Sequence, residues 1–266
     1  MDAGQTPIPK IIHQIWLGTN PIPTEWMKTV EDFADKYGYK YMLWKESSIG
    51  ELGIDEFPGL STLYDTFKKH LAGKADIIRL LVLYKYGGVY IDADTVIMKP
   101  EQLNAFLEKN RAGVFFGWEK LTSARTKKLG NVDSQIRNTR KMIANGIIGS
   151  AAKHPFLKKL LLGAAENVQG YNTEERMQPW RVIGPHYVTR AYHATRKEFP
   201  DIHVYPMKYF YPLHWGGITD PELHKKVKIP KQSMMFQYGY TTNSFDKIFK
   251  NREGRKTRRR SKTTST

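Results

Sequence analysis

The chain has 266 residues, 40% of them hydrophobic and none of them cysteine, and its formal net charge at pH 7 is +16. This size suits one large or two small globular domains, and the missing cysteines exclude disulfide bonds and thiolate metal sites. No apolar run reaches the length of a membrane span, about 18 residues. Residues 1–5 contain neither the basic region nor the apolar region of a signal peptide. We therefore expect a soluble, cytoplasmic protein, compatible with a bacterial or viral source.

The first half of the chain alternates apolar strands with helices. Strands are expected over 11–16 and 39–44, with a helix from Glu25 to about Lys36 between them, and His13 in the first strand is expected to be structural. This order and spacing predict a parallel α/β layer of the nucleotide-binding kind. The next elements are two helices and two short strands, expected over 62–71, 74–86, 89–92 and 95–98.

The second half is expected to contain several strands, two helices and one long loop. The polar and basic stretch 119–140 predicts a mobile loop, either a lid or an acceptor loop. The regular elements are expected over 114–118, 143–148, 155–168, 186–197, 203–205 and 208–211, with a last apolar segment over 234–240. There is no internal repeat and no linker, so the sequence predicts one α/β domain with helical insertions.

Two carboxylates follow the apolar strand that ends near Ile91. Because side chains alternate along a strand, Asp92 and Asp94 are expected to point the same way. Like charges this close repel by roughly 1–4 kcal/mol, and a hard divalent cation held by carboxylate oxygens relieves that repulsion. The pattern indicates a metal that holds a nucleotide diphosphate; the alternative interpretation of an isolated Asp-x-Asp is a polar turn.

Asp76 and Arg79 lie three residues apart, on one face of the preceding helix. A guanidinium can donate in a fork to hydroxyls or phosphate, and a carboxylate can accept two sugar hydroxyls. The alternative is an intrahelical salt bridge, worth about 0.3–0.5 kcal/mol when exposed.

These residues carry a resemblance to a known family. The stretch from Arg79 to Asp94 resembles the core of the DXD-motif sugar transferases, glycosyltransferase family 32, which includes yeast-type Golgi mannosyltransferases and capsule-synthesis enzymes. It resembles more distantly the glucosylating domain of large clostridial toxins. Residues 11–18, 145–149 and 184–185 are similar to other blocks of the family, so the resemblance covers roughly residues 8–215.

The resemblance implies a GT-A-like nucleotide-sugar-binding domain over residues 8–250, with a mixed, mostly parallel sheet. It implies a metal-dependent, retaining glycosyltransferase with Mn²⁺ or Mg²⁺ as cofactor. The donor would be a UDP- or GDP-hexose, and the acceptor a hydroxyl of a glycan or glycoprotein. No carboxylate nucleophile is evident in the sequence, so we expect front-side attack assisted by the leaving phosphate.

The resemblance also assigns roles to residues of this chain. Asp94 would bind the metal directly, and Asp92 would reach it through water or bind ribose and sugar hydroxyls. Asp76 and Arg79 would lie at the donor sugar, and these four residues form the expected catalytic set.

Donor binding is expected from five further residues. Trp16, next to Ile15, would stack on the base, with core packing as the alternative. Tyr90 would reach a phosphate or the base, while Asn145 and Gly146 would let a sugar approach the backbone closely.

The resemblance weakens toward the C-terminus. The family often ends with His-His-Trp followed by Ser-Trp, which supplies a further metal or phosphate ligand, whereas residues 237–245 contain no histidine. Asn243 and Ser244 are the expected replacements, with Gln237 as a third candidate. This departure keeps open a catalytically impaired sugar-nucleotide or glycan-binding module. Residues 214–217 would form a rim of the acceptor pocket or pack in the core.

The basic C-terminal segment explains part of the net charge. Residues 252–262 carry seven Arg and Lys against one Glu, and no apolar residue follows Asn251, so residues 251–266 are expected to be disordered. This segment is either simply solvated or makes a peripheral contact with an anionic membrane or polysaccharide surface. Binding to nucleic acid is the least favoured interpretation of the charge.

Overall fold

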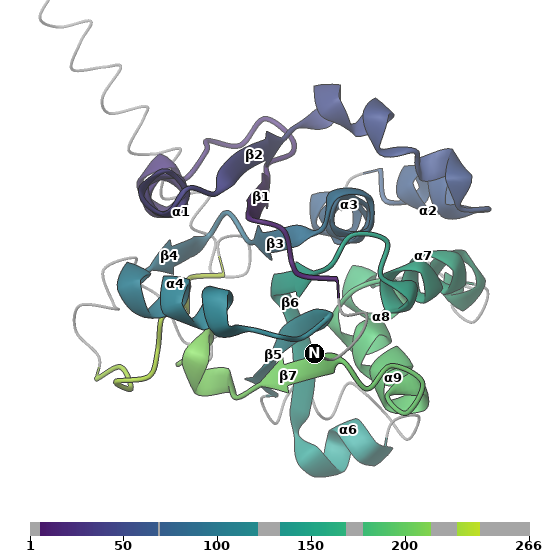
Figure 1. Ribbon diagram of the computed structural model, residues 1–266. Helices are drawn as coiled ribbons and strands as arrows, with labels where there is room; N and C mark the ends of the chain where they lie inside the picture. The colour runs from purple at the N-terminus through teal and green to yellow at the C-terminus, as the bar shows by residue number, and fades with distance from the viewer. Residues whose placement is uncertain (1–5, 69, 122–133, 169–177, 214–227, 240–266) are drawn as a thin grey trace, which may run out of the picture.

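The structure, a computed structural model, describes residues 6–68, 70–121, 134–168, 178–213 and 228–239. Its centre is a six-stranded sheet in the order β2-β1-β3-β6-β5-β7 (Figure 1). The strands are β1 Ile11–Ile15, β2 Lys40–Trp44, β3 Gly88–Ile91, β5 Val114–Lys120, β6 Lys141–Ser150 and β7 Ile202–Tyr205. In this sheet only β6 runs antiparallel to its neighbours, so the expected mixed, mostly parallel sheet is confirmed.

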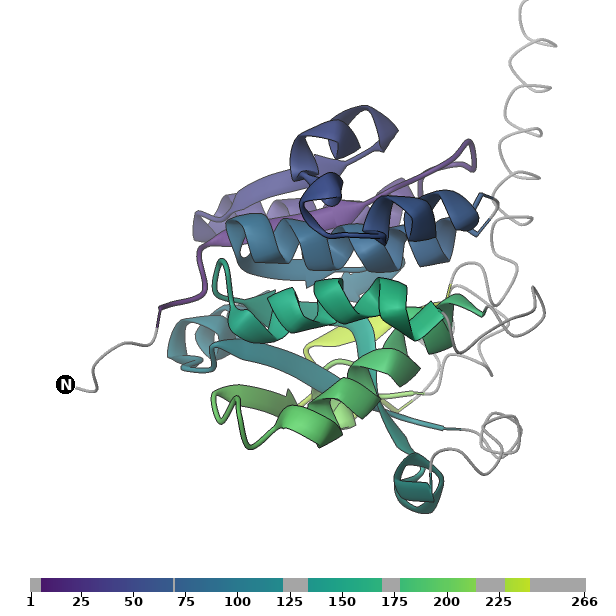
Figure 2. The same ribbon diagram turned by 90° about the vertical axis from the view of Figure 1, so that its right-hand side faces the viewer.

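Helices cover both faces of this sheet (Figures 1 and 2). On one face lie α1 (Thr24–Tyr37) and α4 (Pro100–Lys109), and on the other α3 (Leu71–Tyr86), α7 (Pro155–Val168) and α9 (Pro185–Thr195). A hydrophobic core lies on each face of the sheet, and the side chains of β5 point alternately into one and the other. Val114 and Phe116 pack in the core with α3 and α7, whereas Phe115 packs in the core with α1. A sheet buried on both faces accounts for strands that read as apolar runs.

The first element that positions the candidate site is α3. It is apolar on nearly all sides, which is typical of a buried helix, and Asp76 and Arg79 are buried within it. Gly87 (φ 64°) ends the helix and Gly88 (φ 99°) begins β3. At Gly88 a Cβ atom would lie 2.5 Å from the carbonyl oxygen of Ile11. Two glycines therefore allow the chain to pass directly from the helix into the centre of the sheet.

A small second sheet brings the C-terminal part of the described chain back to the end of β3. It pairs β4 (Thr95–Ile97) antiparallel with β8 (Met235–Gln237). Trp26 of α1 stacks on Tyr238, with ring centroids 4.2 Å apart and planes 5° apart. Phe236 completes this buried aromatic cluster, which fixes β8 against the first helix.

Most expected elements are confirmed within a few residues, and two expectations are wrong. Residues 208–211 are not a strand, because η3 (Met207–Tyr209) forms a 3-10 turn after Pro206 and the consecutive Phe210 and Tyr211 are both buried. The stretch 119–140 is not one loop, since β5 continues to Lys120 and α6 (Ser134–Thr139) precedes β6. Residues 122–133 lie outside the described residues, as does the expected tail 251–266.

The remaining elements are short. They are η1 Glu46–Leu52, η2 Ile54–Glu56, α2 Leu60–Thr66 and α8 Pro179–Val182. None of the described helices is long and apolar enough to cross a membrane.

Candidate active site

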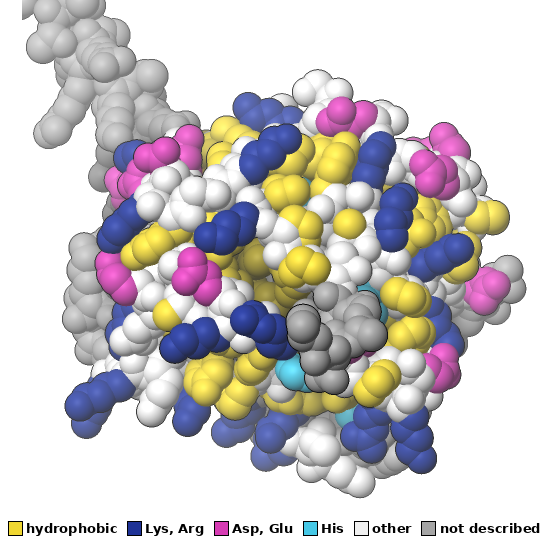
Figure 3. Space-filling model, in the orientation of Figure 1, with side chains coloured by type: hydrophobic (Ala, Val, Ile, Leu, Met, Phe, Trp, Pro, Cys, Tyr) yellow, Lys and Arg dark blue, Asp and Glu magenta, His cyan; other side chains and the backbone are white. Residues whose placement is uncertain are grey.

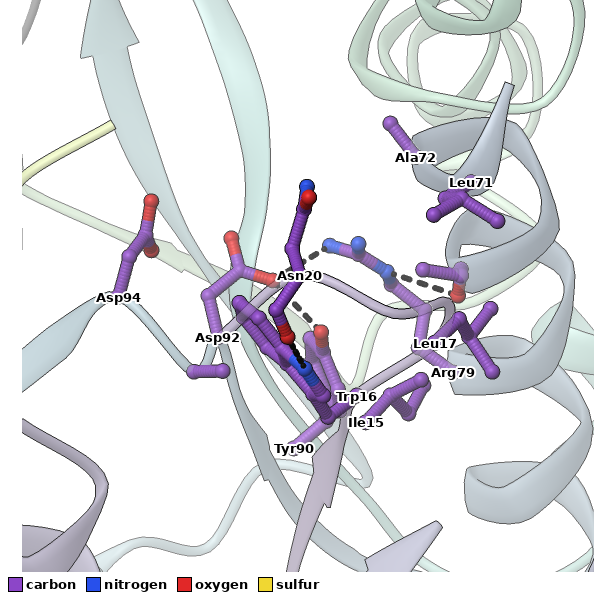
Figure 4. A pocket seen from close by; sticks show the side chains of 12 residues that line it. Ile15, Trp16, Leu17, Asn20, Leu71, Ala72, Arg79, Tyr90, Asp92 and Asp94 are labelled. Carbon is purple, nitrogen blue, oxygen red and sulfur yellow. Dashed lines mark hydrogen bonds and ion pairs between the residues drawn. The ribbon is translucent and has the colours of Figure 1, made fainter. Parts of the chain in front are cut away.

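A pocket opens where β1 and β3 end and α3 begins (Figure 4). Its position agrees with the general rule that open α/β sheets bind ligands beyond the carboxyl ends of their strands. The lining residues are Ile15, Trp16, Leu17, Asn20, Leu71, Ala72, Ala75, Arg79, Tyr90, Asp92, Ala93 and Asp94. Six of them belong to the residues predicted from the sequence, so the fold gathers segments that are about 75 positions apart in the chain.

Asp92 is the centre of the polar contacts in this pocket. Its Oδ1 accepts the Tyr90 hydroxyl at 2.6 Å and lies 3.2 Å from Nη1 of Arg79. The backbone of Asp92 is fixed as well, because its N–H donates to the carbonyl of Gly146 at 2.8 Å and its carbonyl accepts Nε2 of Gln14 at 3.3 Å. Figure 4 shows Asp92 between Arg79 and Asp94.

Asp92 and Asp94 are held together by a turn and a shared partner. The strand β3 ends at Ile91, and the N–H of Thr95 donates to the Asp92 carbonyl at 3.1 Å, so strand alternation alone does not align the two carboxylates. Nε2 of Gln237 donates to Asp92 Oδ2 at 2.6 Å and to Asp94 Oδ1 at 3.2 Å. The expected convergence of the pair is confirmed, with Gln237 as a structural cause that alternation did not predict.

Arg79 links the aspartate pair to the interior of α3. Its Nη2 lies 3.3 Å from Asp76 Oδ1, so the intrahelical salt bridge considered as the alternative does form, and Nη1 donates to the carbonyl of Asn145. The guanidinium lies over the Tyr90 ring, 4.6 Å from its centroid. Burial acts to lower the pKa of Arg79, but the acidic groups around it raise it on balance. The site therefore contains a buried, charged guanidinium.

Asp76 and Asn145 form the inner wall of this network. Burial raises the pKa of the Asp76 carboxyl to about 6, which outweighs the opposing effect of Arg79. Nδ2 of Asn145 donates to Asp76 Oδ1 at 3.4 Å, and its own Oδ1 is buried without a hydrogen-bond partner in the described part of the chain. A buried amide oxygen of this kind is suited to accept a hydroxyl from a ligand.

Two glycines allow close packing around the aspartates. A Cβ atom at Gly146 would lie 2.9 Å from Asp92 Oδ2, and one at Gly184 would lie 2.7 Å from Asp76 Oδ2. The segments that the family resemblance singled out, 145–149 and 184–185, thus lie directly against the two carboxylates.

Trp16 lines the pocket with Ile15 and Leu17 beside it. Its indole Nε1 donates to the carbonyl of Asn20 at 3.0 Å, and its half-buried side chain also packs against the aromatic cluster of Trp26, Phe236 and Tyr238, as the alternative of core packing expected. Its stacking role stays a prediction.

His13 is structural, as expected. Nδ1 accepts the indole N–H of Trp44 at 3.0 Å, and Nε2 lies 2.8 Å from the carbonyl of Gly87. These contacts fit a neutral ring that donates from Nε2. Burial lowers the pKa of His13 to about 4.

Some expected residues cannot be placed, and some contributors were not expected. Asn243, Ser244 and residues 214–217 lie outside the described residues. In the described part, no three His, Asp or Glu side chains gather as a metal cluster. Sequence reasoning missed the small residues Ala72 and Ala75, whose spacing with Arg79 on one helix face was the available signal.

Comparison with known proteins gives matches to a family model, to curated relatives and to solved structures. Residues 23–112 match the model of the family described as glycosyltransferase sugar-binding region containing DXD motif. Inositol phosphoceramide mannosyltransferase 3 of Schizosaccharomyces pombe is 28% identical over 224 residues, which cover 82% of this chain and 52% of the relative. An uncharacterized glycosyltransferase, L373, of Acanthamoeba polyphaga mimivirus is 36% identical over 151 residues, or 56% of this chain and 52% of the relative.

The chain thus spans about half the length of these curated relatives. Among solved structures, the PaToxG glycosyltransferase superposes with a TM-score of 0.51 at 21% identity, covering 73% of this chain and 71% of that one. This likeness concerns the fold, which is the expected GT-A-like α/β domain.

Proposed function

We propose that this chain is a glycosyltransferase of the kind whose sugar-binding region contains a DXD motif, the family whose model matches residues 23–112, and that it transfers a hexose from a nucleotide-diphosphate donor to an acceptor hydroxyl. The observation that carries the proposal is the convergence of Asp92, Asp94 and the buried Arg79 on one pocket. Two carboxylates and one cationic guanidinium are the groups needed to hold a metal–diphosphate and the sugar attached to it.

The two aspartates would hold the cation, Mn²⁺ or Mg²⁺. Carboxylate oxygens are the ligands such ions prefer. Asp92 Oδ2 and Asp94 Oδ1 already share one hydrogen-bond donor, so the space between them attracts positive charge. When bound, the cation would neutralise charge on the leaving diphosphate. Asn243 and Ser244 are proposed as further ligands from the sequence alone.

The protein side chains would orient the donor. Arg79 has five donors in a planar fork and is held by Asp76 and Asp92, so it would be preorganised toward phosphate or sugar oxygens. Asp76 and the unpartnered Oδ1 of Asn145 would accept sugar hydroxyls. Trp16 would stack on the base, and Tyr90 would keep Asp92 in place.

In the proposed reaction the acceptor oxygen forms a bond to the anomeric carbon as the bond from that carbon to the diphosphate oxygen breaks. The acceptor proton passes to the leaving phosphate on the same face, so configuration is retained. Charge on the diphosphate rises during this step. A buried guanidinium stabilises such charge without prior reorganisation.

The names of the relatives suggest which substrates to test first. The fission yeast relative is a mannosyltransferase of inositol phosphoceramide, so we propose a GDP-linked mannose as the first donor and a phosphate-bearing glycolipid or glycan as the first acceptor. UDP-hexoses are the second set of donors.

The experiment is release of nucleoside diphosphate from a panel of GDP- and UDP-sugars, with Mn²⁺ and with EDTA. We expect release from one donor, only with metal, and a loss of about 100-fold or more in Asp94→Ala at an unchanged circular dichroism spectrum. Asp65→Ala, which changes an exposed aspartate on α2, is the matched control and should keep full activity. Activity that persists in EDTA would contradict the proposed metal dependence.

A sugar-nucleotide-binding module is the alternative. It is favoured by the lack of histidine in residues 237–245. It predicts donor binding in calorimetry without diphosphate release, even when acceptors are supplied.

A further inference from the structure

Gln237, the last residue of β8, occupies the space between the two carboxylates. Its Nε2 lies 2.6 Å from Asp92 Oδ2 and 3.2 Å from Asp94 Oδ1. One amide nitrogen therefore offers its two N–H groups to two like charges. Because a donor in this place offsets their repulsion, it does part of what a bound cation would do.

The backbone fixes Gln237 in this place. It pairs with Thr95, the residue after Asp94, and the N–H of Tyr238 donates to the Asp94 carbonyl at 3.0 Å. Phe236 and Tyr238 are buried against Trp26 on the other side of β8. Alternation along the strand thus leaves Gln237 on the side of the carboxylates.

The strand β6 closes the remaining side of this space. A Cβ atom at Gly146 would lie 2.9 Å from Gln237 Nε2 and 3.0 Å from its Oε1. The carboxamide is therefore confined between the backbone of β6 and the two aspartates, within reach of any ion that binds there.

We propose that Gln237 belongs to the cation site in both of its states; this inference rests on the proposed function. Without a cation, the amide N–H groups bridge Asp92 and Asp94. With a cation, the amide turns about its last torsion by about 180°, a rotation between the two broad wells of this bond, and presents Oε1 to the ion. A carboxamide can do both because its donor and acceptor ends have nearly the same shape.

The test is direct binding of Mn²⁺ alone to the full chain, measured by calorimetry in the absence of any donor. Gln237→Leu removes the amide oxygen and should weaken binding about tenfold, the range found when groups that support a metal site are removed. Gln237→Glu supplies oxygen only and adds a charge, so it should tighten binding about tenfold or more. Gln102→Glu makes the same charge change at an exposed position of α4 and should leave the affinity unchanged.

Thermal unfolding provides a second measurement. In EDTA, Gln237→Glu should have a lower Tm than the wild type, because a third carboxylate then replaces the amide donor between Asp92 and Asp94, and Mn²⁺ should raise its Tm more than that of the wild type. Gln237→Leu should also have a lower Tm in EDTA but gain less from Mn²⁺.

Several results would overturn the inference. Unchanged Mn²⁺ binding in Gln237→Leu would mean that the amide is not a ligand, and tighter binding would mean that it only obstructs the ion. No Mn²⁺ binding by the wild type would show that there is no cation site. Failure of the proposed function is seen separately, as transfer that resists EDTA or no transfer at all. Metal-dependent transfer with unchanged affinity in Gln237→Leu would contradict the inference about Gln237 alone.

Discussion

His13 and Asp76 are buried ionisable groups whose pKa values are displaced in opposite directions. Burial lowers the pKa of His13 to about 4 and raises that of Asp76 to about 6. In the folded protein both groups therefore resist becoming charged. Between about pH 4 and 6.5 the unfolded chain holds more protons than the folded chain at His13, and fewer at Asp76.

The stability supplied by His13 is present above pH 6.5 and is lost as the pH falls toward 4. The difference between its ordinary pKa of 6.5 and about 4 corresponds to about 3 kcal/mol of unfolding free energy. In His13→Gln, an amide that keeps one donor and one acceptor, this acid-induced loss should disappear. Urea unfolding at pH 7 and pH 4 measures it; an equal loss in variant and wild type would contradict the prediction.

Asp76 contributes in the opposite direction. Its raised pKa favours the folded state at low pH, and this contribution is lost as the pH rises from about 4 through 6. Asp76→Asn should therefore lose more stability than the wild type when the pH is lowered from 7 to 4. Measured together, the two variants should diverge in acid. Parallel pH profiles would mean that neither group titrates as its burial implies.

At the scale of elements, the closeness of β5 and β6 depends on a glycine. Gly149 pairs with Phe115 across the two strands, and a Cβ atom there would lie 1.9 Å from Cε1 of that ring. Phe115 is fully buried, and its ring contacts three other aromatic rings of the same face, those of Phe106, Tyr205 and Phe210. The ring therefore has little room to move away.

We expect Gly149→Ala to lower the free energy of unfolding by about 1–3 kcal/mol, the usual cost of overpacking. Adding Phe115→Leu should recover part of the loss, because it removes the atoms in conflict. Gly50→Ala is the control, since nothing lies within 4 Å of a Cβ atom at that position. Chemical denaturation of the three variants and the wild type tests this; a harmless Gly149→Ala would show that the strands can separate freely.

Local patterns predicted the elements well where one rule dominated. The apolar runs around residues 11–16 and 89–92, the glycines at 87–88 and the apolar helix before them gave β1, β3 and α3. Lys208–Tyr211 failed because aromatic residues suit strands by propensity, whereas Pro206 and the burial of two consecutive side chains impose a turn.

Site residues near one another in sequence were also predictable, and distant ones were not. Arg79, Tyr90 and Asp92 could be connected by helix and strand periodicity. Gln237 could only be named as one of three candidates, because its contact with the aspartates follows from the pairing of β8 with β4, which no local pattern encodes.

For the whole molecule, the positive charge is unevenly divided along the chain. Residues 1–112 contain 13 basic residues (Lys and Arg) and 15 acidic residues (Asp and Glu). Residues 113–266 contain 29 basic and 11 acidic residues. On the face drawn in Figure 3, the Lys and Arg side chains are spread over the surface rather than gathered into one patch. Spread charge of one sign favours diffuse attraction to an anionic surface over recognition of a single group.

We expect the chain to bind phosphatidylserine vesicles at low salt and to be released by about 0.5 M salt, where screening is nearly complete over a few Å. Removal of residues 252–266, with net charge +6, should weaken binding at least tenfold, since each basic residue near such a surface is worth about 1 kcal/mol. Co-sedimentation with neutral vesicles is the control. Binding insensitive to both salt and truncation would contradict an electrostatic origin, and equal binding to duplex DNA would favour nucleic acid.

The contact between Gln237 and Asp92 joins residues 145 positions apart. During synthesis, a chain that has passed the DXD motif, α3 and the central sheet still lacks the strand that holds the two aspartates together. Contacts of such long range form late in folding, and domains that emerge from the ribosome fold from their N-terminal side. The proposed cation site is therefore complete only when nearly the whole domain has been translated, and a prematurely ended chain would hold the two aspartates without the residue that bridges them.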